Sequence, residues 1–203
     1  MILSYAPAAA REGLVALLAL DDQLADVVRT TREAMVGQMR FTWWHGALTA
    51  LDTAPPPAQP VLRALAAHVV PRVPGAMLAG MVEGWEELLD AGDAGEAGML
   101  DRYAAGRGGT LFATAARLVG PEDARVRVAG EGWALADLAG RARDSQLAAR
   151  ARAAGNERLR GLTAARWSRA LRPVSAMALL ARMPEATPAA RIGRILLHRL
   201  TGK

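Results

Sequence analysis

The sequence lacks cysteine, contains a single lysine and has few aromatic residues. Without cysteine it can form neither a disulfide framework nor a thiolate zinc or iron–sulfur site, and it has no cysteine nucleophile. A metal site would have to be built on carboxylates. Because Phe, Trp and Tyr make up only 4% of the residues, the core must be filled mainly by Ala, Leu, Val and Met, which favours helices over strands.

Long apolar runs are also missing. The longest uncharged stretch extends from Phe41 to Leu51, whereas a bilayer-spanning helix needs roughly 20 apolar residues. The first residues have the character of neither a signal peptide nor an organelle presequence. We therefore expect a cytoplasmic protein, with peripheral attachment to the inner membrane as an additional hypothesis.

The chain has 203 residues, 52% of them hydrophobic, which predicts a single folded domain over residues 1–203. Its formal net charge of +5 is unevenly distributed. Residues 1–140 contain 11 basic and 17 acidic side chains, a net charge of −6, whereas residues 141–203 contain 14 basic and 3 acidic ones, a net charge of +11. This asymmetry favours a polyanionic partner for the C-terminal part, either a nucleic acid or an anionic membrane.

Proline and glycine divide the chain into segments of helical length, within which apolar residues such as Leu17, Leu20 and Leu24 recur at spacings of three and four. No segment alternates with the period of a strand. The pattern predicts an all-α, single-domain helical bundle. The expected helices cover residues of about 11–34, 35–51, 60–70, 74–90, 99–119, 123–155, 162–182 and 189–200.

Two segments are candidates for chemistry. Asp22 and Asp26 lie one helical turn apart, so they can share a Mg²⁺ ion, although a solvated acidic face opposite the leucines is the favoured interpretation. The segment Gly106–Thr110 has the composition of a phosphate-binding turn, but it lies in a helical stretch without a preceding strand. We interpret it as a place where two helices approach closely.

The pair Trp43 and Trp44 is expected to provide one core residue and one half-buried neighbour. The three histidines are scattered along the chain, and no Ser/His/Asp arrangement can be recognised. A hydrolase is therefore not supported.

Several segments together resemble the squalene/phytoene synthase family. Residues 33–48, EAMVGQMRFTWWHGAL, are similar to the family's EPMLGEIRLQWWRDAL-type helix, and residues 102–110 are similar to its GYCYxVAGTVG helix. Residues 11–20, 59–61 and 84–88 resemble the helix before the first aspartate motif, the HPV segment and the G-M-x-x-D-L segment. The resemblance implies the all-α isoprenoid synthase (trans-prenyltransferase) fold and a Mg²⁺-dependent joining of two prenyl diphosphates.

The same resemblance implies that the catalytic aspartates are largely lost. The DDxxD motif falls on residues 25–29, where Asp26 remains and Arg29 replaces the last aspartate. The second motif, DVGED, falls on residues 141–145, where Arg141 stands first and Asp144 is the remaining acid. We expect no cofactor and no three-metal chemistry. Arg29 and Arg141 either bind a phosphate or pair with Asp26, Asp22 or Asp137 across the former cleft, the second being favoured.

Short members without these aspartates resemble the branch that includes a mitochondrial complex I assembly factor, which is non-catalytic and peripheral to the inner membrane. The sequence therefore predicts a binding or assembly protein rather than an enzyme. The expected partners are a partner protein, an anionic membrane or both, and a prenyl lipid is a further candidate ligand. No nucleic-acid partner is expected. One alternative is an active prenyltransferase of squalene, phytoene or carotenoid biosynthesis, with Mg²⁺ held by Asp22, Asp26, Asp137 and Asp144. A remote alternative is a helical DNA-binding regulator.

The expected terminal helix, residues 189–200, is basic and amphipathic. Its apolar residues fall on one face and its arginines on another, with Arg199 at the boundary. We predict that Arg191, Arg194 and Arg199 bind an anionic membrane surface. The alternative is a last helix packed on the bundle with its arginines in water.

Overall fold

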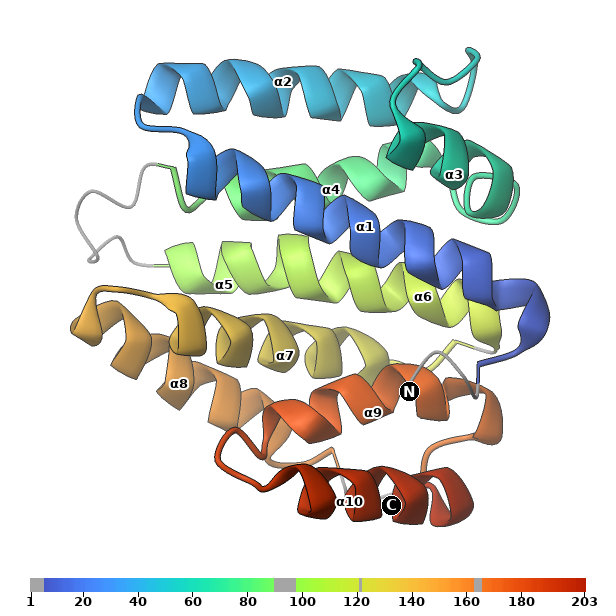
Figure 1. Ribbon diagram of the computed structural model, residues 1–203, viewed down its shortest axis with the longest axis vertical. Helices are drawn as coiled ribbons and strands as arrows, with labels where there is room; N and C mark the ends of the chain where they lie inside the picture. Colours follow the sequence, from blue (N-terminus) through green and yellow to red (C-terminus); the bar gives the residue numbers. More distant parts are fainter. Residues whose placement is uncertain (1–5, 90–97, 121, 163–165) are drawn as a thin grey trace.

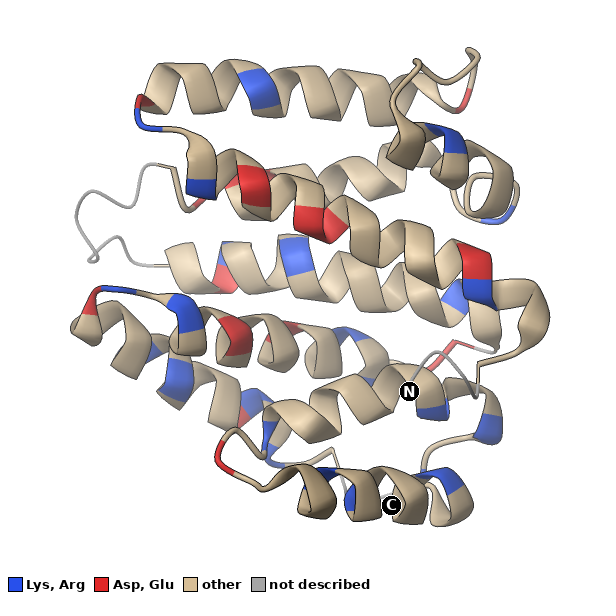
Figure 2. Ribbon diagram, viewed as in Figure 1, with Lys and Arg blue, Asp and Glu red and all other residues tan. Residues whose placement is uncertain are grey.

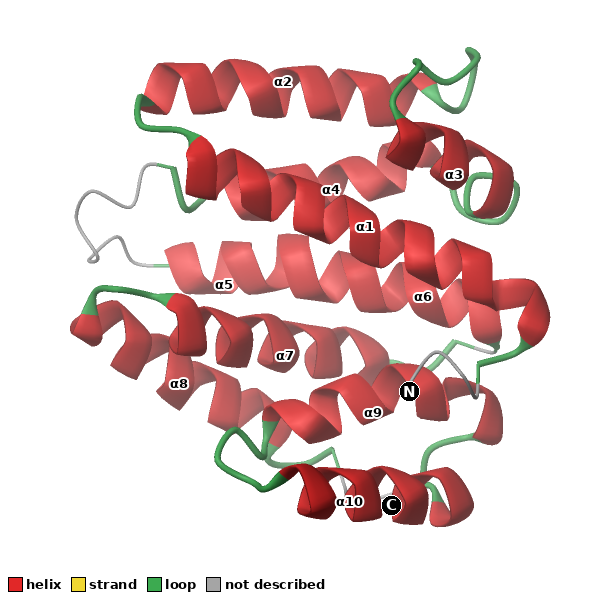
Figure 3. Cartoon of the chain, viewed as in Figure 1, coloured by secondary structure: helices red, strands yellow, loops and turns green. Residues whose placement is uncertain are grey.

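The computed structural model describes residues 6–89, 98–120, 122–162 and 166–203, in which every regular element is helical (Figure 3). The all-α prediction is thereby confirmed. In chain order the elements are α1 (Ala8–Thr30), α2 (Ala34–Ala50), α3 (Pro60–His68), α4 (Gly75–Glu86), α5 (Met99–Tyr103), the π-helical turn η2 (Ala104–Gly109), α6 (Thr110–Val119), α7 (Arg125–Arg141), α8 (Ser145–Leu159), the 3₁₀ turn η3 (Arg169–Leu171), α9 (Arg172–Ala181) and α10 (Pro188–Thr201).

The helices form a bundle with α2 at one end of its long axis and α10 at the other (Figure 1). Between them lie α1, α4, the continuous α5–η2–α6 segment and α7, with α8 packed on α7. The predicted leucine stripe of α1 is buried in the core, since Leu17, Leu20 and Leu24 have at most 1% of their surface exposed. Trp44 is buried and Trp43 is 50% exposed, which confirms the prediction for this pair.

One predicted helix is wrong. The expected helix over residues 123–155 is divided into α7 and α8, because Ala142 is extended and Asp144 begins a new helix. The Asp144 side chain accepts a hydrogen bond of 2.6 Å from the backbone N–H of Leu147, the usual contact of an N-cap. The expected helix over residues 162–182 begins later than predicted, at η3. Residue 90, at the end of the helix expected over 74–90, and residues 163–165 lie outside the described residues.

Close approach of helix backbones explains the glycine-rich segment within η2. A Cβ atom added to Gly108 would overlap the backbone carbonyl of Gly130 in α7, and one added to Gly106 would lie 2.6 Å from the Cα of Gly84 in α4. The prediction that residues 106–110 mark a helix–helix contact is therefore confirmed. Since η2 packs against both α4 and α7, this contact brings three helices to one point.

The terminal helix α10 packs on α9 through Ile195 and His198, which are both buried. The His198 Nε2 lies 2.8 Å from Ser175 Oγ, and its Nδ1 lies 3.1 Å from the carbonyl oxygen of Lys203. Burial lowers the pKa of His198, so the ring is neutral at pH 7. Because α10 contacts α9 through Ile195 and His198, most of the apolar face of α10 is turned toward solvent. Its residues Ile192, Leu196, Leu197 and Leu200 are 45–79% exposed.

No helix in the described ranges is both long and apolar enough to cross a membrane.

Candidate functional site

A buried arginine occupies the centre of the bundle. Arg107 projects from η2, and only 3% of its side chain is exposed. Its guanidinium forms a bidentate contact with Asp21 of α1, with Nε 2.9 Å from Oδ1 and Nη2 2.8 Å from Oδ2. On the other side its Nη1 lies 2.9 Å from Oδ2 of Asp137 in α7 and donates to the Tyr103 hydroxyl at 2.5 Å. Arg107 therefore joins α1 to α7 by ion pairs.

Aromatic rings enclose the same guanidinium. Its central carbon lies 4.2 Å from the ring centroid of Trp85, 4.7 Å from that of Trp133 and 5.7 Å from that of Tyr103. These distances are within the range of cation–π attraction. The Trp85 Nε1–H also donates to Asp21 Oδ1 at 2.9 Å. The rings exclude water from the ion pair and hold its carboxylate in place.

The charges in this cluster are fixed. Burial is the largest single influence on Arg107 and opposes its charge, but the attraction to Asp21, Tyr103 and Asp137 and the hydrogen bond with Asp21 together outweigh it, and the net effect raises the pKa of the guanidinium above its ordinary value. Burial raises the pKa of Tyr103 to about 12. Arg107 thus stays cationic and Tyr103 neutral at physiological pH. Asp137 is shared with Arg141, whose Nε donates to Asp137 Oδ1 at 2.9 Å.

The residues predicted from the family motifs lie around this cluster rather than in it. Arg29 pairs with Asp26 at 2.5 Å, with 68% and 40% of their side chains exposed. Arg141, which is 67% exposed, pairs with Asp137 four residues earlier in α7. The predicted partners Asp26 and Asp137 are confirmed, but the prediction that these pairs cross the cleft is wrong, because each pair lies along a single helix.

The other two predicted acids have different surroundings. Asp22 is exposed on α1, whereas Asp144 caps α8. Within the described residues, no group of three or more His, Asp or Glu side chains is placed to hold a metal ion.

The carboxylates that do face the bundle centre do not fit the magnesium ions that the family resemblance implies. Asp21 and Asp137 both contact the Arg107 guanidinium, and Asp137 also pairs with Arg141, so each of the two negative charges already has a cationic partner. A Mg²⁺ ion at the same place would be repelled by Arg107 and would have to displace it from both carboxylates.

The main members of the cluster were not predicted from the sequence, although it contains signals for two of them. Asp21 follows Leu17 by four residues and precedes Leu24 by three, so it shares the buried face of α1. An acid on a buried apolar stripe requires a cationic partner. Arg107 is the one charged residue between the glycines of residues 106–109, where the helices approach most closely.

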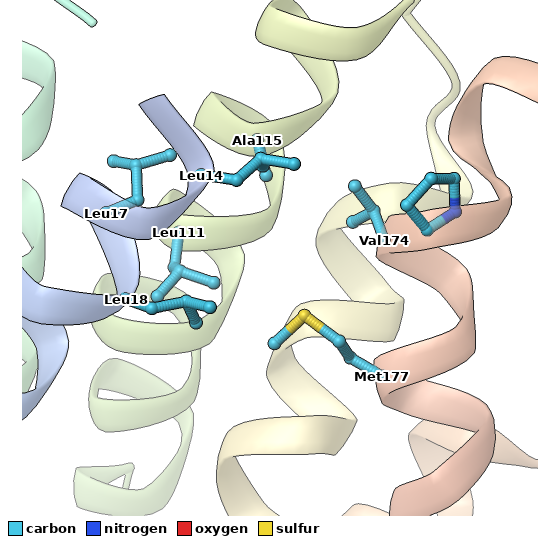
Figure 4. A pocket seen from close by; sticks show the side chains of 8 residues that line it. Leu14, Leu17, Leu18, Leu111, Ala115, Val174 and Met177 are labelled. Atoms are coloured by element: carbon cyan, nitrogen blue, oxygen red, sulfur yellow. The ribbon is translucent and has the colours of Figure 1, made fainter. Parts of the chain in front are cut away.

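The cavity between α1, α6 and α9 is small and entirely apolar (Figure 4). It measures about 20 Å³, which is room for roughly one water molecule and too little for a prenyl chain. A shallower depression of about 380 Å³ lies beside Asp137 and is open to the surface. Its lining consists of Trp133, Ala136, Asp137, Met177, Leu180, Ala181, Pro184 and Arg191.

Comparison with known proteins places this architecture in a family. The squalene/phytoene synthase family model matches residues 1–161, which include α1 to α8. No curated protein and no solved structure matches the chain. Helices α9 and α10 lie beyond the matched residues. The match covers most of the chain and agrees with the all-α bundle described above, and the protein therefore belongs to the squalene/phytoene synthase family.

Proposed function

We propose that this protein does not condense prenyl diphosphates and instead acts as a binding or assembly protein at the cytoplasmic face of the inner membrane, by analogy with the non-catalytic, membrane-peripheral branch of the family that its sequence resembles. The observation that carries the proposal is the position of Arg107. It binds Asp21 in α1 and Asp137 in α7. Helix α1 contains residues 25–29, where the family's first aspartate motif falls, and α7 leads into residues 141–145, where the second one falls.

The family's chemistry requires Mg²⁺ between those motifs, because the ions neutralise the diphosphate and help pyrophosphate to leave. In this protein the cation between the helices is a guanidinium whose charge is balanced by two carboxylates. It is enclosed by Trp85, Trp133 and Tyr103, so it offers little free charge to a diphosphate. Arg107 thus supports the loss of catalysis while keeping the helices together.

The alternative is an active prenyltransferase that uses Asp22, Asp26, Asp137 and Asp144 as metal ligands. Three of these four carboxylates already have partners in the protein. Asp26 pairs with Arg29, Asp137 pairs with Arg107 and Arg141, and Asp144 caps α8. Recruiting them to Mg²⁺ would break each of these contacts, and the alternative is therefore less favoured.

The outward face of α10 supports the membrane part of the proposal. Four large apolar side chains, Ile192, Leu196, Leu197 and Leu200, are exposed on α10, which lies at the end of the bundle and belongs to the basic C-terminal part of the chain, residues 141–203 (Figure 2). Such a helix can lie in the interfacial plane of a membrane with its arginines near the headgroups. Of the arginines predicted to bind the membrane, Arg199 is exposed beside the leucines, Arg194 is partly buried and Arg191 donates to the carbonyls of Met183 and Pro184.

A second apolar surface lies at the opposite end of the bundle. Helix α2 exposes Met35, Val36, Met39 and Trp43, between 45% and 76% of each, while its other face packs on the core. Methionine and tryptophan are common at protein-binding surfaces. We assign this α2 face to the partner protein, which leaves α10 for the membrane (Figure 1).

Vesicle flotation separates the roles of the two faces. We expect the wild-type protein to float with phosphatidylglycerol vesicles, and a Leu196→Ser, Leu200→Ser variant to lose most of its floated fraction because interfacial binding depends on buried apolar area. The matched control is Met35→Ser, Met39→Ser, which removes two exposed apolar side chains from α2 and should float like the wild type. Equal flotation of the α10 variant, or loss of flotation in the α2 variant, would contradict the assignment of α10 as the anchor.

A further inference from the structure

A basic depression lies where α10 meets the start of α9. Its volume is about 570 Å³, and it is lined by Arg169, Arg172, Leu196, Arg199 and Leu200. We refer to these five residues as the basic groove. It combines three guanidinium groups with two leucines that are 50% and 79% exposed. The groove lies on the same side of α10 as the apolar face described above.

The groove has a rigid wall. Arg172 donates from Nη1 to the carbonyls of Arg199 at 2.7 Å and Leu200 at 3.2 Å, which fastens the C-terminal end of α10 to the beginning of α9. The backbone N–H of Trp167 donates to the carbonyl of Gly202 at 2.8 Å, so the chain just after α10 is held as well. These contacts fix the distance between η3, which carries Arg169, and the last turn of α10, which carries Arg199.

The electrostatic surroundings favour an anion. Residues 166–203 contain eight basic side chains and one acidic one, Glu185. Glu185 lies in the loop before α10, at the opposite end of that helix from Arg199. Arg169 is exposed, and no carboxylate in the part of the chain that the structure describes forms an ion pair with it. Guanidinium groups bind phosphate, as they bind carboxylate, through pairs of charge-assisted hydrogen bonds to two oxygens.

We infer that the basic groove binds the phosphate of an anionic phospholipid headgroup, with the acyl chains lying over Leu196 and Leu200. This inference rests on the proposed membrane function and adds a ligand class to it. The exposed leucines at the rim distinguish a lipid from a free phosphate, because a soluble phosphate ester would leave them in contact with water. Because a choline headgroup would add a cation beside the three guanidiniums of the groove, we expect the protein to prefer anionic over zwitterionic lipid.

The test compares two charge-matched variants of the full-length chain. Arg169→Glu, Arg199→Glu reverses two charges in the groove, and Arg143→Glu, Arg152→Glu reverses two charges at exposed positions around α8. Flotation is measured over a range of phosphatidylglycerol and phosphatidylcholine vesicle concentrations, and folding is checked by circular dichroism. We expect the groove variant to bind phosphatidylglycerol on the order of thirtyfold more weakly than the wild type, or weaker still, whereas the control stays within about twofold, as expected for charges outside the contact.

Each other outcome contradicts a different statement. Equal loss in both variants would show that net charge alone attracts the protein, and would overturn the groove. Equal binding of the wild type to both lipids would overturn headgroup recognition but leave the membrane function standing. No binding to any vesicle would overturn both. Displacement of the wild type from vesicles by soluble glycerol phosphate would show that the groove takes a free phosphate, and would overturn the lipid assignment.

Discussion

Replacement of Arg107 by methionine should lower the free energy of unfolding by about 3–5 kcal/mol, the usual cost of removing one partner from a buried ion pair. The substitution leaves the Asp21 carboxylate, which is 7% exposed, without its bidentate partner and removes the bridge between α1 and α7. Urea unfolding followed by tryptophan fluorescence measures the change, and it is suited to this site because Trp85 and Trp133 contact the guanidinium.

The matched control is Arg160→Met at the C-cap of α8. Arg160 is 73% exposed and pairs with Glu157 three residues earlier, so its removal should change stability by less than about 1 kcal/mol. If Arg107→Met does not fold at all, Arg107→Lys keeps the charge without the bidentate geometry and should be intermediate. An Arg107→Met variant as stable as the control would show that the cluster does not hold the bundle together.

Substitution of Gly108 by alanine should also have a large effect. We expect it to lower the free energy of unfolding by about 3 kcal/mol or more, because the added methyl group overpacks the contact. The added methyl group would overlap the backbone carbonyl of Gly130 and lie 2.8 Å from the Ala134 Cβ, so η2 and α7 would have to separate. Because η2 carries Arg107, the separation would also weaken the ion pairs to Asp21 and Asp137. Thermal or urea unfolding of the purified variant measures this loss.

Substitution of Gly46 in α2 by alanine should change stability in the opposite direction. Apart from the backbone of its own helix, no atom of the described residues lies within 4 Å of a Cβ built there, so Gly46→Ala meets no obstacle and should raise stability by up to about 1 kcal/mol through helix propensity. Similar effects at the two glycines would mean that the contact between Gly108 and Gly130 is looser than described.

The bundle could be predicted from sequence because helical periodicity and proline or glycine breaks are local signals. Leu17, Leu20 and Leu24 fall on one face at any reasonable helix boundary, and all three are buried. The break between α7 and α8 was missed because Ala142 and Arg143 are ordinary helix residues. Its only local signal is the capping pair Asp144 and Ser145, which was interpreted as part of a degenerate metal motif.

The centre of the site could not be predicted in the same way. The contact between Asp21 and Arg107 joins residues 86 positions apart in the chain, and no local pattern encodes such a pairing. Attention to the family motifs favoured Asp26 and Arg141, whose partners turned out to lie within their own helices. For α10 the sequence left two arrangements open, a membrane-binding apolar face and a helix packed on the bundle, and the structure leaves most of that face exposed. An amphipathic pattern identifies an apolar face, but tertiary packing decides whether that face is covered.

The proposal that Arg107 takes the place of the metal centre is tested most directly by pyrophosphate release. The purified full-length protein is incubated with Mg²⁺ and farnesyl or geranylgeranyl diphosphate, in parallel with an Asp26→Ala variant. We predict no release above background from either protein, because the carboxylates facing the bundle centre are bound to Arg107 and the one acid left in the first motif, Asp26, is bound to Arg29. Sustained, Mg²⁺-dependent release by the wild type that disappears in Asp26→Ala would contradict this proposal and establish the chain as a working prenyltransferase.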